Sequence, residues 1–184
     1  MDDNKVNIKS LFPNEIAIKH LDLSKLKIEG KEFQETFESK VKTTYNGETL
    51  LDKNSINYLK EQLKETLDYL LKPYCEAFAF NVFEIWINKY EDNDYQGNHV
   101  HPADFSFIIY YKTDKSHTVF NSPVKNLLES TANKIFKFQY ETDFKQGDMV
   151  VFPSYLEHWV KPNSNNITVS GNIKIIDIKN VWNK

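Results

Sequence analysis

Arginine is absent from this sequence, and all 23 basic residues are lysine. An arginine guanidinium holds a carboxylate or phosphate through two parallel hydrogen bonds, whereas a lysine ammonium acts as a single compact charge. Any anion site in this protein must therefore be built from lysine, hydroxyl and amide groups. The formal net charge is −3, so the chain lacks the basic character of most nucleic-acid-binding domains, and we expect no nucleic-acid partner.

Cysteine and long apolar runs are scarce as well. Cys75 is the only cysteine, which excludes an intrachain disulfide and favours a reducing compartment. No apolar run approaches the roughly 20 residues that span a bilayer, and residues 1–10 are too polar for a signal peptide. We therefore expect a cytoplasmic protein without a membrane partner.

Aromatic residues, in contrast, are plentiful, with 13 Phe, 10 Tyr and 3 Trp among 184 residues. Aromatic side chains fit a pleated, half-buried surface, so this composition favours a sheet-rich core.

Helical patterns are confined to the N-terminal part of the chain. Two phenylalanines four positions apart predict a helix over residues 31–42. The clearest helix follows it, with Asn54 or Ser55 as the N-cap and Pro73 at its end. Its apolar stripe consists of Ile56, Leu59, Leu63, Leu67, Leu70 and Leu71. Residues 74–80 are compatible with a further turn of helix.

Strand patterns dominate the rest of the sequence. They cover residues 14–22, 82–90, 104–112, 117–120, 134–141, 149–152, 157–160 and 167–178. Short strands behind a helical N-terminal layer favour a jelly roll with helices packed on one sheet. We therefore predict a mainly β fold of the α+β class, a double-stranded β-helix. It would form a single domain, residues 1–184, with a helical support segment, 1–80, and a jelly-roll core, 81–180.

Three histidines form the strongest chemical signal. His99 and His101 lie two positions apart, and in an extended segment residues i and i+2 point to the same side. Both imidazoles can therefore bind one metal ion, and His158 can join them if a jelly roll brings its distant strand alongside. Imidazole suits iron, zinc, copper and nickel, and three such ligands leave open positions for a cosubstrate and dioxygen.

Each of these signals also has a purely structural interpretation. A His-x-His pair is common without a metal, and a single histidine such as His158 is more often packed or exposed than a ligand. His20 and His117 have no such neighbours, so we assign them structural or surface roles. Asp104 either supports or replaces a histidine ligand, or it is a turn residue that opens the next strand.

Two segments around the three histidines resemble a known family. Residues 86–112 contain a tryptophan, a short acidic loop, the motif HVHP and an aromatic strand. Residues 147–163 contain GD, an apolar strand, FP and a histidine followed by PN. Together with ITVSGN at 167–172, these segments are similar to the Fe(II)/2-oxoglutarate-dependent oxygenases, in particular to small bacterial and phage members related to prolyl hydroxylases.

The resemblance implies Fe(II) bound by His99, His101 and His158, with 2-oxoglutarate and dioxygen as cosubstrates and ascorbate as an optional cofactor. It implies oxidative decarboxylation of 2-oxoglutarate to succinate and CO2, coupled in most relatives to hydroxylation. The prime substrate would be a peptidyl residue, in a peptide or protein partner, or a small metabolite. His101 takes the place of the aspartate in the family's more familiar His-x-Asp motif, as it does in the small His-x-His-Pro relatives.

The family's arginine on the last strand, which binds the distal carboxylate of 2-oxoglutarate, corresponds to Asn166 here. A lysine or several hydroxyl groups must replace it, because a buried carboxylate without a partner is costly. Our first choice is Lys112, on the strand position that resembles the lysine of some asparaginyl hydroxylases, and our second is Lys174. The full set of cosubstrate-binding candidates is Lys112, Tyr110, Ser106, Asn88, Tyr90, Asn166, Thr168, Ser170 and Lys174. For each lysine the alternative is a solvated surface charge.

Two other functions stay open. A three-histidine, cupin-like metalloenzyme that does not use 2-oxoglutarate, such as a thiol dioxygenase or an isomerase, is favoured by the missing arginine. A non-catalytic binding module on the same fold is disfavoured by the three intact histidines. The FP and PN context around His158 favours the 2-oxoglutarate-dependent oxygenase.

Overall fold

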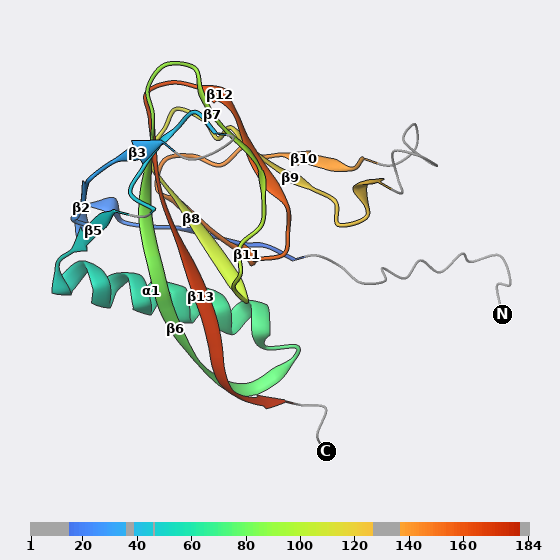
Figure 1. Cartoon of the computed structure of the whole chain (residues 1–184). Coiled ribbons are helices and arrows are strands. Elements are labelled where there is room, and N and C mark those ends of the chain that lie inside the picture. Colours follow the sequence, from blue (N-terminus) through green and yellow to red (C-terminus); the bar gives the residue numbers. More distant parts are fainter. Residues whose placement is uncertain (1–14, 36–38, 46, 127–136, 181–184) are drawn as a thin grey trace, which may run out of the picture.

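The computed structural model describes residues 15–35, 39–45, 47–126 and 137–180 (Figure 1). Most of this part of the chain is β-sheet, and the helices that lie wholly within it are one α-helix and a short 3-10 turn, η1 (Leu23–Lys25). No helix within it is long and apolar enough to cross a membrane.

The larger of the two main sheets has seven strands, and neighbouring strands are antiparallel. In spatial order they are β1 (Ala17–His20), β11 (Asp148–Pro153), β8 (Phe105–Lys112), β13 (Asn166–Asn180), β6 (Cys75–Tyr90), β4 (Lys42–Thr43) and β3 (Gln34–Glu35). β6 and β13 are the longest strands and pair along most of their length (Figure 1). The strand predicted over 14–22 is confirmed in its central part, as β1 at one edge of this sheet.

The smaller main sheet has four antiparallel strands. In spatial order they are β10 (Gln139–Glu141), β9 (Thr118–Asn121), β12 (His158–Asn163) and β7 (Asp94–His99). The chain passes repeatedly between the two sheets, because β6 leads into β7, β8 into β9 and β11 into β12. This is a jelly roll, and the predicted fold class is confirmed. A separate two-stranded sheet pairs β2 (Ile28–Lys31) with β5 (Glu48–Leu51).

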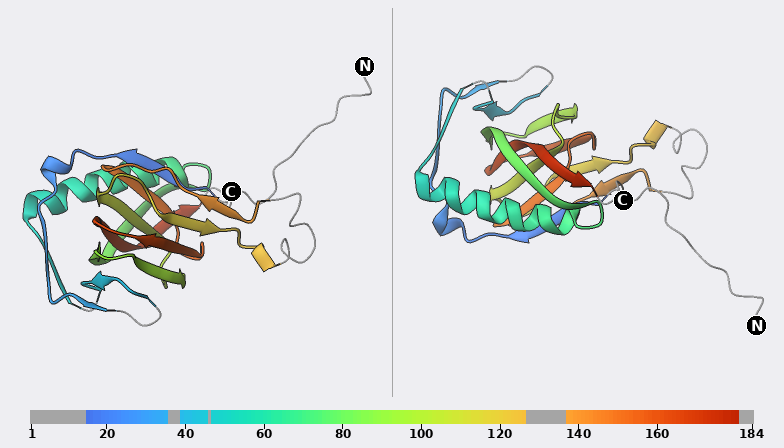
Figure 2. Two further views of the ribbon diagram at one scale, coloured as in Figure 1. Left: turned by 90° about the horizontal axis from the view of Figure 1, so that it is seen from above. Right: turned by 90° about the horizontal axis from the view of Figure 1, so that it is seen from below.

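The helix α1 (Lys53–Leu71) lies across the outer face of the large sheet (Figure 2). Its N-cap is Asp52, whose carboxylate accepts a hydrogen bond from the backbone N–H of Ser55 at 2.7 Å. The cap therefore precedes the predicted Asn54 or Ser55. The helix ends at Leu71, ahead of Pro73 as predicted. Four leucines of the predicted stripe are buried against the sheet, namely Leu59, Leu63, Leu67 and Leu70.

Two helical predictions are wrong. Residues 31–42 contain the end of β2, β3 and the start of β4 instead of a helix, and residues 36–38 lie outside the described part. Glu32 has a φ of 56°, a left-handed conformation that no right-handed helix contains. Residues 75–80 belong to β6, because they pair with the end of β13. The division into a support segment and a core stays a prediction.

The strand β8 has both faces buried. Phe107 and Ile109 pack in the cluster between the large sheet and α1. Ile108 and Tyr110 pack in the cluster between the two sheets, which also contains Phe120 of β9. Since successive side chains of a strand point to opposite faces, this alternation directs Tyr110 into the interior of the jelly roll. The candidate site lies in that interior.

Candidate metal centre and cosubstrate cavity

The three predicted histidines converge in the structure. His99 ends β7, His158 begins β12, and the two residues are paired in the register of the small sheet. His101 follows β7, and its backbone N–H donates to the carbonyl of Ser154 at 3.0 Å. The ligand nitrogens of the three imidazoles all lie within 4.8 Å of one another. One divalent metal ion fits between them, so the predicted grouping is confirmed, while its role as a ligand set stays a proposal.

Hydrogen bonds orient two of the imidazoles. Nδ1 of His99 lies 2.8 Å from the carbonyl of Gly97, and Nδ1 of His158 lies 3.0 Å from the carbonyl of Leu156. A carbonyl only accepts, so each Nδ1 carries the proton and each Nε2 is left with a free lone pair. Fixing the tautomer in this way is typical of histidines that bind metals through Nε2.

Burial keeps all three histidines neutral. It lowers the pKa of His99, and burial, followed by the repulsion that a protonated His99 would exert, lowers the pKa of His101 to about 4. Burial and then the two other histidines lower the pKa of His158 well below its usual value. Because only a neutral imidazole can bind a metal, the group is ready to bind one at neutral pH.

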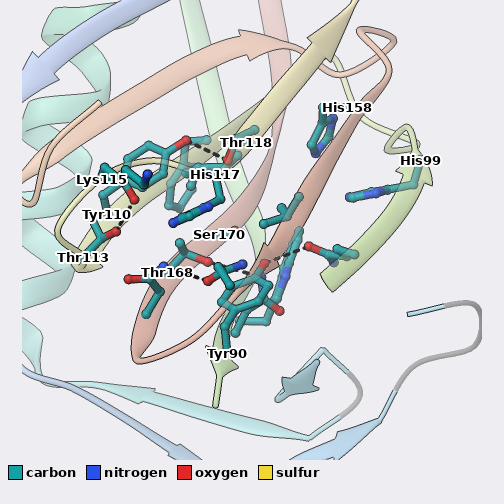
Figure 3. Close-up of a pocket in the computed structure, with 18 of the residues that line it drawn as sticks. Tyr90, His99, Tyr110, Thr113, Lys115, His117, Thr118, His158, Thr168 and Ser170 are labelled. Atoms are coloured by element: carbon teal, nitrogen blue, oxygen red, sulfur yellow. Dashed lines mark hydrogen bonds between the residues drawn. The ribbon is translucent and has the colours of Figure 1, made fainter. Parts of the chain in front are cut away.

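A polar cavity extends from the three histidines into the space between the sheets (Figure 3). Six of the predicted cosubstrate-binding residues line it: Asn88, Tyr90, Tyr110, Asn166, Thr168 and Ser170. They come from β6, β8 and β13, which are neighbours in the large sheet. No Asp or Glu is among the described residues that line the cavity.

Three other candidates lie elsewhere. Ser106 is buried in a core network, where its hydroxyl donates to Oδ1 of Asn172 at 2.9 Å and contacts the hydroxyl of Ser154 at 2.7 Å. Lys112 is exposed and does not line the cavity. Lys174 is exposed as well and forms an ion pair with Asp104 at 3.0 Å.

The same ion pair holds Asp104 beside β13. Its second carboxylate oxygen accepts the backbone N–H of Ile175 at 2.8 Å, so Asp104 is tied to β13. It is not part of the histidine group, which removes the support for a ligand role.

Lys115 and His117 line the cavity, although neither was predicted to be a binding residue. Both belong to the loop between β8 and β9, with Thr113 and Thr118 at its two ends. His117 is half-buried rather than a simple surface residue. The sequence could have indicated these two residues only through their position, because the loop joins two strands that line the same interior. The direction of a side chain in a loop cannot be derived from strand alternation.

The cavity contains polar groups whose hydrogen bonds are incomplete. The hydroxyl of Tyr110 donates to Thr118 at 2.8 Å, and that of Tyr90 donates to Gln96 at 3.1 Å. The amide oxygens of Asn88 and Asn166 are buried without any partner. Buried polar atoms without partners are costly, so this lining fits a polar ligand better than a dry core.

A second recess shares Trp86, Gln96, His99 and His101 with the cavity. The ring of Tyr45 packs edge-on against Trp86 at 5.0 Å, and Trp86 lies 5.4 Å from His101. The remaining lining residues are Ser39, Thr43, Gly97, Asn98 and Val100. The histidine group therefore borders two separate hollows.

A jelly roll with three convergent, neutral histidines beside a polar cavity has the donor set and the open side of a non-haem metal enzyme. Residues 84–172, which include all three histidines, match the sequence profile of the family described as "Putative 2OG-Fe(II) oxygenase". No curated protein matches the sequence.

Solved structures share the fold. One is an oxidoreductase of the 2OG-Fe(II) oxygenase family from Burkholderia pseudomallei, with 10% identity, a TM-score of 0.51, and coverage of 73% of this chain and 68% of the other. Another is the viral collagen prolyl hydroxylase of Paramecium bursaria Chlorella virus-1 in its 2OG complex, with 13% identity, a TM-score of 0.50, and coverage of 73% and 79%.

The chain is recognised as similar to the 2OG-Fe(II) oxygenase family by this profile match, which covers just under half of its length. It is an enzyme, and its cofactors are Fe(II) and 2-oxoglutarate. The histidine group provides the nitrogen ligands that iron accepts, and the cavity beside it provides polar groups without a competing carboxylate.

Proposed function

We propose that this oxygenase hydroxylates an uncharged position of a peptidyl residue or a small metabolite, with release of succinate and CO2. His99, His101 and His158 are the proposed iron ligands. The observation that supports this most directly is the convergence of their three neutral imidazoles at the end of the polar cavity.

The surrounding side chains hold these ligands in place. Phe152 packs edge-on against His158 at 5.0 Å, Phe120 lies 5.7 Å from it, and Trp86 lies 5.4 Å from His101. These aromatic rings pack against the imidazoles, and His158 is buried among them. When bound, Fe(II) and 2-oxoglutarate together supply the oxidant that is made from dioxygen.

The cavity and the recess suggest a division of roles. The cavity, with its hydroxyl and amide groups, is the proposed site of 2-oxoglutarate. The recess beside Tyr45 and Trp86 is the proposed site of the prime substrate. Among its described lining residues only the histidines are ionisable apart from Tyr45, and burial raises the pKa of that phenol, which keeps it neutral. A substrate that presents an uncharged group fits this lining.

Two alternatives lose support. The family match counts against a cupin-like enzyme without 2-oxoglutarate and against a non-catalytic module. A cytoplasmic location and a kinship with phage enzymes remain predictions from the sequence.

The proposed function is tested on the purified chain. Anaerobic addition of Fe(II) and 2-oxoglutarate should give a visible metal-to-ligand charge-transfer band, and succinate should form in air only when both are present. Candidate peptides and metabolites can then be ranked by how much they stimulate succinate formation. If neither the band nor succinate appears, the proposal is wrong.

A further inference from the structure

The distal carboxylate of 2-oxoglutarate needs a partner, and this chain has no arginine to provide it. The family's position for that arginine is Asn166. The Nδ2 of Asn166 donates to Oδ1 of Asn163 at 2.7 Å, while the Nδ2 of Asn163 donates to the carbonyls of Asp94 and Lys161. These bonds fix the Asn166 amide, which keeps one N–H of Nδ2 and a buried Oδ1 without a partner. A neutral amide cannot balance the charge of a carboxylate as an arginine does, so the charged anchor must lie elsewhere.

Lys115 is the one lysine among the described residues that line the cavity. The two lysines favoured by the sequence, Lys112 and Lys174, lie outside it. Within the described part of the chain, the ammonium of Lys115 makes no ion pair, whereas Lys174 is neutralised by Asp104. Since no carboxylate lines the cavity, the charge of Lys115 is available to an anion there.

The neighbours of Lys115 add hydrogen-bond donors. His117 lines the same cavity, and a neutral imidazole still has one N–H to donate. Thr118 accepts the hydroxyl proton of Tyr110 at 2.8 Å, which leaves its own proton free to donate. The hydroxyl of Thr113 donates to the carbonyl of Lys115 at 2.5 Å and so shapes the loop that carries the lysine.

Figure 3 shows Lys115 and Thr113 at the end of the cavity away from the metal centre. His99 and His158 lie at one end, Lys115, Tyr110 and Thr113 at the other, and His117 and Ser170 lie between them. A 2-oxo diacid whose keto acid end binds the metal would direct its second carboxylate toward the lysine.

We propose that Lys115, together with the donors of His117 and Thr118, holds the distal carboxylate of 2-oxoglutarate in place of the missing arginine. This proposal rests on the proposed function. The anchor is then a single flexible charge carried by the loop between β8 and β9 instead of a rigid fork on the last strand. Its role is selection, because it distinguishes a 2-oxo diacid from a 2-oxo monoacid.

The test compares two ligands of equal chain length, 2-oxoglutarate and 2-oxopentanoate, which lacks the distal carboxylate. Both are titrated anaerobically into the Fe(II)-loaded protein, and binding is followed by the charge-transfer band. Lys115→Met should lower the affinity for 2-oxoglutarate by about tenfold or more, which is the loss expected when a charge-assisted hydrogen bond is removed. It should leave the affinity for 2-oxopentanoate and the amount of bound iron unchanged. Lys115→Arg should restore the preference for the diacid.

Lys112→Met is the matched control, because it removes an exposed lysine three positions away that does not line the cavity. It should bind both ligands like the wild type. Equal affinity of Lys115→Met and wild type for 2-oxoglutarate, or an equal loss for both ligands, would refute the anchor while leaving the proposed function intact. If the wild-type protein itself gives no band with 2-oxoglutarate, the proposed function fails, and the anchor fails with it.

Discussion

His99 and His158 are direct cross-strand partners on β7 and β12, with ring centroids 4.2 Å apart. The two residues are far apart in sequence but adjacent at the same end of the small sheet. A metal bound by both imidazoles therefore connects two neighbouring strands, and with His101 it also fixes the segment that follows β7. Metal binding and the stability of the small sheet are linked through this pair.

Divalent metal should stabilise the native protein. A ligand that binds only the folded state at one hundred times its dissociation constant adds about 2.7 kcal/mol to the free energy of unfolding. Anaerobic Fe(II), or Co(II) as a less redox-active substitute, should raise the melting temperature in a concentration-dependent way. His99→Ala should abolish the increase. His20→Ala is the control, because the His20 ring is largely exposed beside Asp148, outside the histidine group. An undiminished increase in His99→Ala would contradict the ligand assignment.

The metal-free protein should lose stability on mild acidification. His101 has a folded-state pKa of about 4 against an ordinary value of 6.5. Below pH 6.5 the unfolded chain takes up a proton that the native state refuses, so stability falls as the pH decreases toward the folded pKa. Each such histidine contributes a slope of up to about 1.4 kcal/mol per pH unit.

Urea unfolding between pH 7 and 5 measures this slope before most carboxylates titrate. In His101→Gln the free energy of unfolding should depend less steeply on pH than in the wild type, because the unfolded variant takes up one proton fewer. Identical slopes in the two proteins would mean that His101 is not held neutral by burial. Added metal should steepen the loss of stability, since protons then compete with the metal for the imidazoles.

The sequence predicted those features that depend on a regular repeat. The leucine stripe of α1 follows the helical period, and Tyr110, a predicted cosubstrate-binding residue, lines the cavity from the inner face of β8. The pairing of His99 with His101 follows from the two-residue period of a strand, and only the distant partner, His158, needed the resemblance. Lys112, the lysine that the sequence favoured, does not line the cavity, and the role given to it stays a prediction. Lys115 does line the cavity, but it lies in a loop, where no strand period indicates the direction of a side chain. The prediction of a helix over 31–42 was wrong because the spacing of two phenylalanines carries no information about the left-handed backbone at Glu32.

The N-cap of α1 is Asp52 in the structure, whereas the sequence predicted Asn54 or Ser55. Asp52→Ala should lower the free energy of unfolding by about 1 kcal/mol, because the N–H of Ser55 loses its acceptor. Asn54→Ala should have little effect, although the sequence allowed Asn54 as the cap. Denaturant unfolding of the two variants gives the answer, and a larger loss in Asn54→Ala than in Asp52→Ala would place the cap at Asn54 instead.

Ser106 and Ser170 were both predicted to bind the cosubstrate, and the structure separates them. Ser106 is held in the core by Ser154 and Asn172, so Ser106→Ala should destabilise the protein by about 1–3 kcal/mol, the cost of leaving buried partners unsatisfied. Its affinity for 2-oxoglutarate should stay unchanged. Ser170 lines the cavity, so Ser170→Ala should show the opposite pattern, with a weaker affinity and nearly native stability. Anaerobic titration and urea unfolding of both variants measure the two effects side by side. A loss of 2-oxoglutarate affinity in Ser106→Ala at native stability would return that residue to the binding site.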